Sequence, residues 1–474
     1  MVLAAEYNLY GVNRSSDERQ IINACIKDER SHFIVVYGRR RVGKTFLIRQ
    51  HFNNSFTFYC TGLASVDMEA QLLNFAASLS RSKRRNAERP PTSWAEAFER
   101  LIKLLSKSRS KKKVVFLDEL PWMDTARSNF ISALEYFWNG WASARNDIVL
   151  ITCGSAASWM LDNLINNKGG LYNRVSRRIK LRPFSLQEVE QFINKRKFKL
   201  NRYQIIQLHM IFGGVPYYLD MLRPDESIAQ NIDRLIFNED AQLKGEFRLL
   251  FKSLFDKADR HEQIIKALTK RKTGLIRQEI IDRIPHKDGG GITKALEELE
   301  ASDFISSYTY YGKKSRGRRY QLLDPFTLFH FKYIQDKPQS DNYWMSQINS
   351  QSYHSWAGNA FEITCLLHIK NIKNALGIAG IKTESSTWYN NQAQVDLIID
   401  RTDDTINVLE IKYAKNPFTI SQKYAQQLQQ KLASFISATK TKKAVWLVML
   451  TTYGLNPNSY DGDVVKSLTM DDLF

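Results

Sequence analysis

One segment of the chain has the residue types and spacing of a phosphate-binding loop. The run GRRRVGKT follows the apolar stretch HFIVVY and opens the helical stretch TFLIRQHF. Backbone N–H groups of such a loop, and of the helix start behind it, carry partial positive charge and hold phosphate oxygens. Gly38 and Gly43 permit a close approach, Lys44 reaches the β- and γ-phosphates, and the Thr45 hydroxyl is placed to coordinate Mg²⁺. We therefore expect ATP with magnesium to contact the whole loop and the residue after it: Gly38, Arg39, Arg40, Arg41, Val42, Gly43, Lys44, Thr45 and Phe46.

A second element agrees with a nucleotide site. The run KKKVVFLDELPW is an apolar strand pattern that ends in the acidic pair Asp118 and Glu119. Asp118 is expected to hold Mg²⁺ through water, and Glu119 is expected to polarise the attacking water. Hydrolysis of ATP is therefore predicted in addition to binding, with Lys44 and Glu119 as catalytic residues.

A further group of charged residues lies near the end of the chain. Asp396 stands in QAQVDLIID, and Glu410 and Lys412 stand in NVLEIKYA. Residues two apart in a strand face the same side, and a hairpin between the two strands brings Asp396 alongside them. Two carboxylates can hold Mg²⁺ with its waters, and a lysine can position the attacking water. Glu362, in the helical stretch GNAFEITCLLHI, is a further candidate metal ligand.

The middle of the chain has the pattern of a small DNA-binding module. Helical patterns at 261–270, 274–284 and 292–301 lead into ISSYTYYGKKSRGRRYQLLD, which predicts two strands joined by a basic turn. The third helix is net acidic and unsuited to reading bases. The turn carries cations that would grip phosphate without sequence information, so binding should depend on salt and only weakly on sequence. These cations are Lys313, Lys314, Arg316, Arg318 and Arg319. A spacer that packs on the ATPase is the alternative.

These sites require elements that position them. Over residues 1–240, β-rich runs alternate with helical periodicity, which predicts a parallel sheet covered by helices. The expected domains are a P-loop ATPase domain with a helical lid (1–240), a winged helix-turn-helix (245–335) and a small α/β domain (354–474). A polar stretch, DKPQSDNYWMSQINSQS, is expected to link the last two. The fold class is α/β.

Residues 8 to about 240 resemble the archaeal-type ATPases of the AAA+/STAND superfamily. The resemblance rests on YGRRRVGKT, LDELPW, CGSAASWM and FGGVPYYL, and LYGVNRSSDERQII is similar to the adenine-side segment of that group. It implies that Ser155 senses the γ-phosphate and that the GGVP turn links the sheet to a helical lid. It also implies that arginines of LYNRVSRRIKL contact phosphate, in cis or from a neighbouring protomer: Arg174, the candidate catalytic arginine, with Arg177 and Arg178. Ser155 as a helix cap, and these arginines as a solvated strand edge, are the alternatives.

The C-terminal residues Glu362, Asp396, Glu410 and Lys412 resemble the E…D…E-x-K signature of the PD-(D/E)XK nuclease fold. ATPases of the archaeal type often carry such a domain at this position. The signature is short, and outward Glu and Lys are ordinary on strands. Val395, in place of a proline, precedes Asp396, and the glutamines of the following helix single out no further catalytic group.

Composition limits the partners. The 474 residues carry a formal net charge of +19, which attracts polyanions, nucleic acid above all. We expect no membrane span and no secretion signal, and the four scattered cysteines indicate a reducing, cytoplasmic compartment without a metal-binding Cys pattern. An ATP-dependent, DNA-processing protein with a nuclease accounts for all three segments. The alternatives are a nucleotide switch or scaffold with an inactive nuclease fold, and a winged-helix regulator; a homo-oligomer is left open.

Overall fold

The computed structural model describes residues 16–83, 89–255, 257–285, 289–312, 318–335, 340–391 and 393–474. The chain divides into two compact units. Of the described residues, 16–182 form the N-terminal unit and 183–474 form the C-terminal unit.

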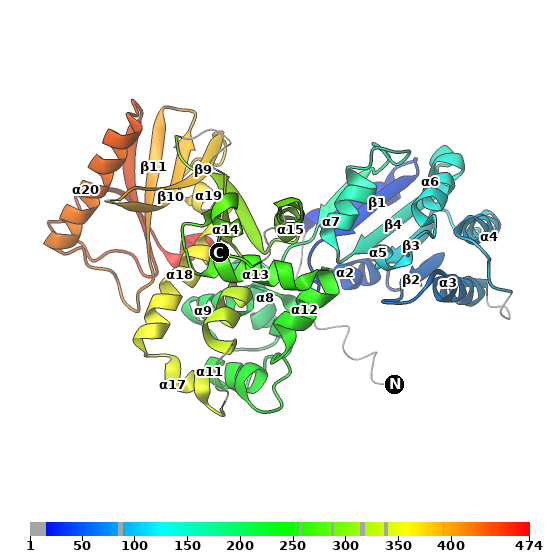
Figure 1. Cartoon of the computed structure of the whole chain (residues 1–474), viewed down its shortest axis with the longest axis horizontal. Coiled ribbons are helices and arrows are strands. Elements are labelled where there is room, and N and C mark those ends of the chain that lie inside the picture. Colours follow the sequence, from blue (N-terminus) through cyan, green and yellow to red (C-terminus); the bar gives the residue numbers. More distant parts are fainter. Residues whose placement is uncertain are drawn as a thin grey trace. The chain divides into compact units, whose positions relative to one another are not determined.

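The N-terminal unit is built on a five-stranded sheet in the order β2-β3-β4-β1-β5, in which every neighbouring pair is parallel (Figure 1). The predicted α/β fold with a parallel sheet is therefore confirmed. The strands are β1 (His32–Tyr37), β2 (Phe58–Thr61), β3 (Lys113–Asp118), β4 (Ile148–Gly154) and β5 (Arg177–Lys180). The helices are α1 (Ser16–Lys27), α2 (Lys44–His51), α3 (Met68–Lys83), α4 (Trp94–Lys107), α5 (Leu120–Met123), α6 (Phe130–Gly140) and α7 (Ala157–Met160).

Both faces of this sheet are buried, as the continuous apolar strands predict. Val115 and Leu117 of β3 belong to one core cluster, together with side chains of α3, α4 and α6. Val114 and Phe116 of the same strand belong to a second cluster on the opposite face, together with side chains of α1 and α2. Because all strands are parallel, their carboxyl ends meet at one edge, where ligands of open α/β sheets bind.

The C-terminal unit begins with helices and continues into a small helix–hairpin module, which comprises residues 258–322. The helices before the module are α8 (Leu186–Lys195), α9 (Arg202–Phe212), α10 (Pro216–Asp220), α11 (Ile228–Ile232) and α12 (Glu246–Leu254). The module contains α13 (Ala258–Thr269), β6 (Leu275–Ile276), α14 (Arg277–Ile281), α15 (Gly289–Ala301), β7 (Ile305–Thr309) and β8 (Arg318–Leu322). Its three strands form an antiparallel sheet in the order β6-β8-β7.

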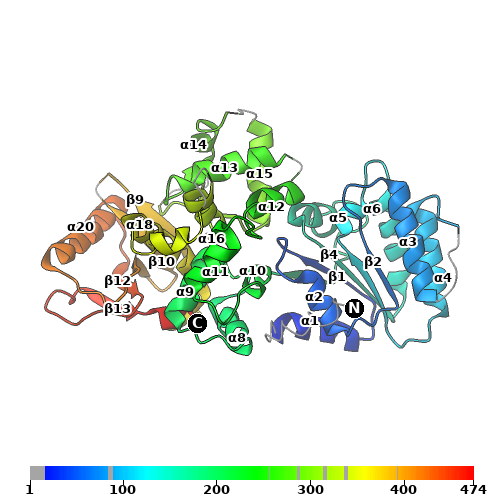
Figure 2. The same cartoon turned by 90° about the horizontal axis from the view of Figure 1, so that it is seen from below.

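The rest of this unit is a mixed sheet with helices, which we call the C-terminal sheet (Figure 2). Its strand order is β13-β12-β11-β10-β9; β9, β10 and β11 are antiparallel, whereas β11, β12 and β13 are parallel. The strands are β9 (Thr383–Tyr389), β10 (Gln394–Arg401), β11 (Thr405–Lys412), β12 (Ala444–Thr451) and β13 (Val464–Leu468). The helices from the module onward are α16 (Pro325–Phe329), α17 (Tyr343–Gln347), α18 (Gln351–Leu367), α19 (Ile369–Ala375) and α20 (Gln422–Thr439).

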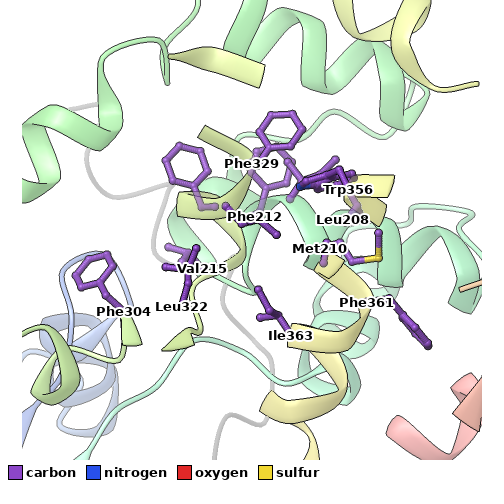
Figure 3. Packing of buried hydrophobic residues seen from close by; sticks show 14 of the residues in the cluster. Leu208, Met210, Phe212, Val215, Phe304, Leu322, Phe329, Trp356, Phe361 and Ile363 are labelled. Carbon is purple, nitrogen blue, oxygen red and sulfur yellow. The ribbon is translucent and has the colours of Figure 1, made fainter. Parts of the chain in front are cut away.

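One large cluster of buried side chains joins the helices, the module and one face of the C-terminal sheet. It joins Phe212 of α9, Phe304 and Leu322 of the helix–hairpin module, and Trp356 and Phe361 of α18 (Figure 3). The boundaries that we predicted at 245–335 and 354–474 therefore lie within one shared core.

The stretch expected to be a polar linker is packed where it is described. Residues 336–339 lie outside the described residues, but the part that follows contains α17. Trp344 is buried, and its backbone N–H and that of Met345 donate to the carboxylate of Asp233 at 2.7 and 3.1 Å. Trp344 belongs to the shared core, and Tyr343 and Ile348 pack against it, so a few apolar side chains dock a stretch that is polar in composition.

Two buried histidines lie in this shared core. His209 of α9 and His368, just after α18, have ring centroids 5.1 Å apart. His368 Nδ1 donates to the Thr364 carbonyl at 2.7 Å, and its Nε2 accepts the N–H of Leu186 at 2.9 Å. Burial lowers the pKa of both imidazoles, and that of His209 lies well below its ordinary value. Both rings are therefore neutral in the folded protein.

We expect this pair to make the C-terminal unit sensitive to acid. As pH falls below about 6.5, the unfolded chain takes up protons that the folded rings cannot accept, so the stability present at neutral pH is progressively lost. Hydrogen exchange should report it as weaker protection of α9 and α18 at pH 5.5 than at pH 7.5, after correction for the intrinsic exchange rate. The loss should be smaller in His209→Leu and unchanged in His354→Gln, which removes an exposed histidine from α18. Equal losses in all three proteins would contradict this origin.

Candidate functional site

The loop between β1 and α2 has the backbone of a phosphate cradle. Gly38 and Gly43 have φ values of 145° and 91°, in a region that glycine adopts most readily. A Cβ added at Gly38 would lie 2.2 Å from the carbonyl oxygen of Leu181. α2 begins directly after Gly43, so the loop leads into the helix end that carries partial positive charge.

Lys44 lies within this loop and is buried. Its Nζ donates to the carbonyl oxygens of Gly38 and Arg39 at 3.0 and 2.9 Å, and to Ser155 Oγ at 3.1 Å. Burial lowers the pKa of Lys44, whereas the nearby charges of Glu119 and Asp118 raise it. The ammonium group is therefore held at the point where the ends of β1 and β4 meet the loop.

Two oxygen ligands for a hard cation lie side by side at the start of α2. Thr45 Oγ1 donates to Asp118 Oδ1 at 3.0 Å. The same carboxylate oxygen accepts the N–H of Glu119 at 3.0 Å and the thiol of Cys153 at 2.5 Å. A hydroxyl and a carboxylate fit Mg²⁺, which prefers oxygen ligands and keeps several of its waters.

Glu119 and Ser155 are joined across neighbouring strand ends. Ser155 Oγ donates to Glu119 Oε1 at 2.7 Å, and Ser155 N–H donates to Oε2 at 3.1 Å. Glu119 has a left-handed backbone with φ 46°, a conformation that is strained for a residue with a side chain and that clusters at functional sites. The helix-cap alternative for Ser155 is wrong, because Ala156 is the N-cap of α7 and the Ser155 hydroxyl bridges Lys44 and Glu119.

The remaining predicted nucleotide contacts differ in exposure. Arg39 is buried, whereas Arg40 and Arg41 are partly exposed. Arg174, Arg177 and Arg178 are exposed, and Arg177 donates to the Ser176 carbonyl at 2.8 Å. The role of Arg174 stays a prediction. The first half of the adenine-side segment lies outside the described residues, and its second half begins α1. The GGVP turn ends α9 at Gly213 and begins α10 at Pro216.

A second acidic centre lies in the C-terminal unit around Glu410, which is 4% exposed. Lys412 Nζ lies 2.8 Å from Glu410 Oε1, and Tyr424 donates to the same oxygen at 2.9 Å. Lys431 donates to Oε2. Burial alone would raise the pKa of Glu410, but the charges of Lys431 and Lys412 lower it, so Glu410 is ionised.

Asp396 lies beside this group. Its Oδ2 accepts the N–H of Ile411 at 3.0 Å, which places the carboxylate next to β11. Burial, together with the charges of Glu410 and Glu362, raises the pKa of Asp396 to about 7. Burial lowers the pKa of Lys412, but the charges of Glu410, Asp396 and Glu362 raise it by more. The pKa therefore lies above its ordinary value, and the lysine stays charged. The predicted proximity of Asp396, Glu410 and Lys412 is therefore present.

Sequence reasoning missed two residues of this centre. Tyr424 and Lys431 both lie on α20 and are seven residues apart, which is two helical turns on one face. The glutamines between them drew attention away, whereas the Tyr-x₆-Lys spacing was the available signal.

Glu362, the third predicted metal ligand, forms an ion pair with a lysine of the helix–hairpin module, and its role as a ligand stays a prediction. Glu362 Oε1 pairs with Lys272 Nζ at 2.9 Å; Lys272 lies in the turn between α13 and β6 of the helix–hairpin module. In the described ranges, no three His, Cys, Asp or Glu side chains are grouped closely enough to hold a metal ion. Different lysines pair with Glu362 and with Glu410, which keeps the two carboxylates apart. Asp396 and Glu410 have the right donor atoms for Mg²⁺, but a metal would have to compete with Lys412 and Lys431.

The cations of the predicted wing divide into three groups. Lys313, Lys314 and Arg316 lie outside the described residues. Arg318 is half-exposed and pairs with Glu300 at 2.7 Å. Arg319 is 8% exposed, and its guanidinium donates to the Gly274 carbonyl at 2.8 Å, to Glu279 at 3.2 Å and to the Tyr389 hydroxyl. Arg319 therefore differs from the exposed phosphate contact that we predicted, because it joins the module to β9.

The fold and the first site together define a class of protein. A glycine-rich loop runs from β1 into α2, an acidic pair ends β3, and the polar residue Ser155 follows β4, the strand between β1 and β3. This arrangement is that of a P-loop nucleoside triphosphatase. The family described as an ATPase domain predominantly from Archaea matches residues 12–222. This part of the chain is therefore an archaeal-type ATPase domain, that is, an ATP-binding ATPase.

Other proteins are similar over longer stretches. An uncharacterized protein of Methanocaldococcus jannaschii is 23% identical over 407 residues, which cover 84% of this chain and 86% of that protein. The Walker-type ATPase of Pyrococcus abyssi is 16% identical with a TM-score of 0.49, covering 67% of this chain and 95% of the other. The Aeropyrum pernix ORC2 protein is 13% identical with a TM-score of 0.40, covering 70% and 93%. A STAND protein of Pyrococcus horikoshii with a tetratricopeptide repeat sensor is 14% identical with a TM-score of 0.30, covering 77% and 51%.

Within the described residues, no helix has both the length and the apolar character needed to cross a membrane.

Proposed function

We propose that the protein is an ATP-dependent nucleic-acid-processing enzyme, in which a magnesium-dependent ATPase controls a metal-dependent phosphodiesterase. The ATPase would use the loop Gly38–Thr45 with Asp118, Glu119 and Ser155. The phosphodiesterase would use Asp396, Glu410 and Lys412 of the C-terminal sheet.

The contacts of Glu119 support hydrolysis. Its carboxylate is bonded to Ser155, which also accepts from Lys44. A γ-phosphate held by Lys44 would therefore lie close to a base that can take a proton from water. Ser155 is placed to change partners when phosphate arrives, which is what a γ-phosphate sensor requires.

One observation carries the second activity: two carboxylates and two lysines meet at β10, β11 and α20. Asp396 and Glu410 would hold Mg²⁺, and Lys412 and Lys431 would then be free to position a phosphate oxygen or the attacking water. A mixed sheet with α18 and α20, and a D…E-x-K set on β10 and β11, are also features of the PD-(D/E)XK nuclease fold to which we assign this part of the chain.

The charge of the chain supports a nucleic-acid partner. A net charge of +19 favours polyanions, and we assign the helix–hairpin module to the winged helix-turn-helix class. Arg318, with Lys313, Lys314 and Arg316, remains the proposed phosphate-binding set, without Arg319. Such contacts predict DNA binding that weakens steeply with salt.

A nucleotide switch with an inactive nuclease fold is the second candidate, and one observation favours it. Both oxygens of Glu410 are bonded to lysines, and Glu362 is paired with Lys272, so two of the three predicted acidic ligands are held in ion pairs. In that case Lys44→Ala would alter assembly or partner binding, whereas substitution of Asp396 would alter neither.

A nuclease assay separates the two candidates. Linear, branched and single-stranded DNA would be incubated with Mg²⁺, with and without ATP, using the wild type and Lys412→Ala. The proposed enzyme nicks or cleaves at least one DNA form, and the variant does not. The absence of cleavage of every form, with ATP turnover intact, would remove the nuclease from the proposal and leave the switch.

The ion pair between Lys272 and Glu362 leads to a separate prediction. Lys272→Met should strengthen Mn²⁺ binding to the acidic centre, by up to about fivefold, because a partly exposed ion pair is worth about 0.2–1 kcal/mol. The protein is first freed of nucleotide and, by washing with EDTA, of metal. Mn²⁺ is then titrated into it, and electron paramagnetic resonance measures the free ion. Lys270→Met, in the same turn and exposed, is the matched control. Equal affinities in the two variants would show that Lys272 does not compete with metal.

A further inference from the structure

The edge strand β2 carries two hydroxyl side chains that face Asp118. Tyr59 and Thr61 are two residues apart and therefore lie on the same side of β2. In the parallel register of β2 and β3, Thr61 stands opposite Asp118. Neither side chain belongs to the phosphate-binding loop or to the acidic pair.

These two hydroxyls hold the oxygen of Asp118 that Thr45 does not contact. Thr61 Oγ1 donates to Asp118 Oδ2 at 3.2 Å, whereas Thr45 donates to Oδ1. Tyr59 OH lies 2.9 Å from Thr61 Oγ1 and 3.5 Å from Asp118 Oδ2. Each hydroxyl has a single proton, and Thr61 is the nearer donor to Asp118, so we assign the Thr61 proton to Oδ2. The proton of Tyr59 is then the one that can satisfy the Thr61 oxygen.

The surroundings fix both hydroxyls. The Tyr59 ring stacks on Phe116 with centroids 5.3 Å apart, and the Arg49 guanidinium lies over its ring at 5.5 Å. The carbonyl of Thr61 accepts from Asn74 of α3 at 2.7 Å, which fixes the end of β2.

We propose that Thr61 and Tyr59 are positioning residues for the magnesium ion of the ATPase. By holding Oδ2, they keep the Asp118 carboxylate in one rotation, with Oδ1 facing Thr45 and the place of the ion. Partners that orient metal-binding carboxylates typically change metal affinity by about 10- to 100-fold when they are removed. The inference rests on the proposed role of Asp118 in holding Mg²⁺, and it assigns to the edge strand β2 a part in nucleotide binding.

The test is the Mg²⁺ dependence of binding to a fluorescent ATP analogue. Thr61→Val keeps the shape of the side chain but removes the hydroxyl, and it should raise the Mg²⁺ concentration for half-maximal binding about tenfold. Tyr59→Phe should give a smaller rise, and Thr61→Ser should restore the wild-type value. Affinity for the analogue in EDTA should be unchanged in all three variants. Thr152→Val is the matched control, since its buried hydroxyl on the neighbouring β4 makes no hydrogen bond within the described part of the chain.

Asp118→Ala separates the two levels of the proposal. If Asp118→Ala raises the Mg²⁺ requirement and Thr61→Val does not, the positioning role is wrong although the magnesium site stands. If Thr61→Val weakens binding equally in EDTA, or if Thr152→Val has the same effect, then Thr61 is a structural residue only. If Asp118→Ala itself leaves the Mg²⁺ requirement unchanged, the proposed magnesium site fails.

Discussion

Glu119→Gln is expected to lower kcat for ATP hydrolysis by at least about 100-fold, the contribution typical of a positioned general base. Mg-ATP affinity should stay within about twofold, because the residues that hold phosphate and metal are untouched. Glutamine keeps the size of the side chain and an oxygen that accepts the Ser155 hydroxyl, which now donates to Glu119 at 2.7 Å. It loses the ability to take a proton from water, and its amide nitrogen cannot accept the Ser155 N–H that Glu119 Oε2 accepts at 3.1 Å.

A phosphate-release assay and a binding titration with a fluorescent ATP analogue together measure this effect. Glu99→Gln, an exposed site on α4, is the control for loss of one negative charge in the same unit. Lys44→Ala should behave differently from Glu119→Gln, because it removes the ammonium that is held within the phosphate loop and should weaken binding itself. Hydrolysis by Glu119→Gln at the wild-type rate would mean that another residue activates the water.

Asp396→Asn has the second large effect, and it acts in two directions. It should reduce Mg²⁺-dependent DNA cleavage at least about 100-fold, since it removes one of two carboxylates available to the ion. It should also stabilise the metal-free protein at pH 8. The folded pKa of Asp396, about 7, lies above its value in the unfolded chain.

The sign of the pH dependence follows from that difference. Well below pH 4, Asp396 is protonated in both states, and its ionisation then contributes nothing to the difference in stability between the two proteins. As pH rises towards 7, the unfolded chain gains an ionised carboxylate that the folded protein resists, so the wild type loses stability. Asparagine cannot ionise and avoids the loss, which we expect to be on the order of 1–3 kcal/mol at pH 8.

Thermal unfolding of metal-free protein at pH 5 and pH 8 tests this second effect. The higher melting temperature of Asp396→Asn should be clear at pH 8 and smaller at pH 5. Asp400→Asn is the control on the same strand: Asp400 pairs with Lys443 at 2.7 Å, and its loss should not stabilise the protein. If Asp396→Asn is less stable than the wild type at pH 8, burial of the ionised Asp396 carboxylate does not lower the free energy of unfolding.

The nucleotide site could be predicted from sequence because its determinants are local. The glycines, Lys44 and Thr45 lie within eight residues, and Asp118 and Glu119 follow a continuous apolar strand. Ser155 came from a family resemblance, and its bridge between Lys44 and Glu119 could not be foreseen. That bridge depends on β4 lying between β1 and β3, an order that no local pattern encodes.

In the acidic centre around Glu410, contacts between residues far apart in the sequence could not be predicted. Asp396, Glu410 and Lys412 follow from strand periodicity, but Lys431 and Tyr424 join them only because α20 packs beside β11. The pairing of Glu362 with Lys272 joins residues 90 positions apart and depends on how the helix–hairpin module packs. Arg319 was predicted as exposed because the turn around it is basic. In the structure it is buried, and its guanidinium donates to the Tyr389 hydroxyl and to the carboxylate of Glu279.

The most direct test of the central claim is the rate of Mg²⁺-dependent DNA cleavage by wild-type and Glu119→Gln proteins, each measured with and without ATP. If the ATPase controls the phosphodiesterase, ATP changes the wild-type cleavage rate several-fold, and the response of Glu119→Gln differs because its cycle stops before hydrolysis. Cleavage rates that do not depend on ATP in either protein would contradict the proposed coupling. The absence of cleavage by the wild type, while ATP is turned over, would contradict the proposed enzyme.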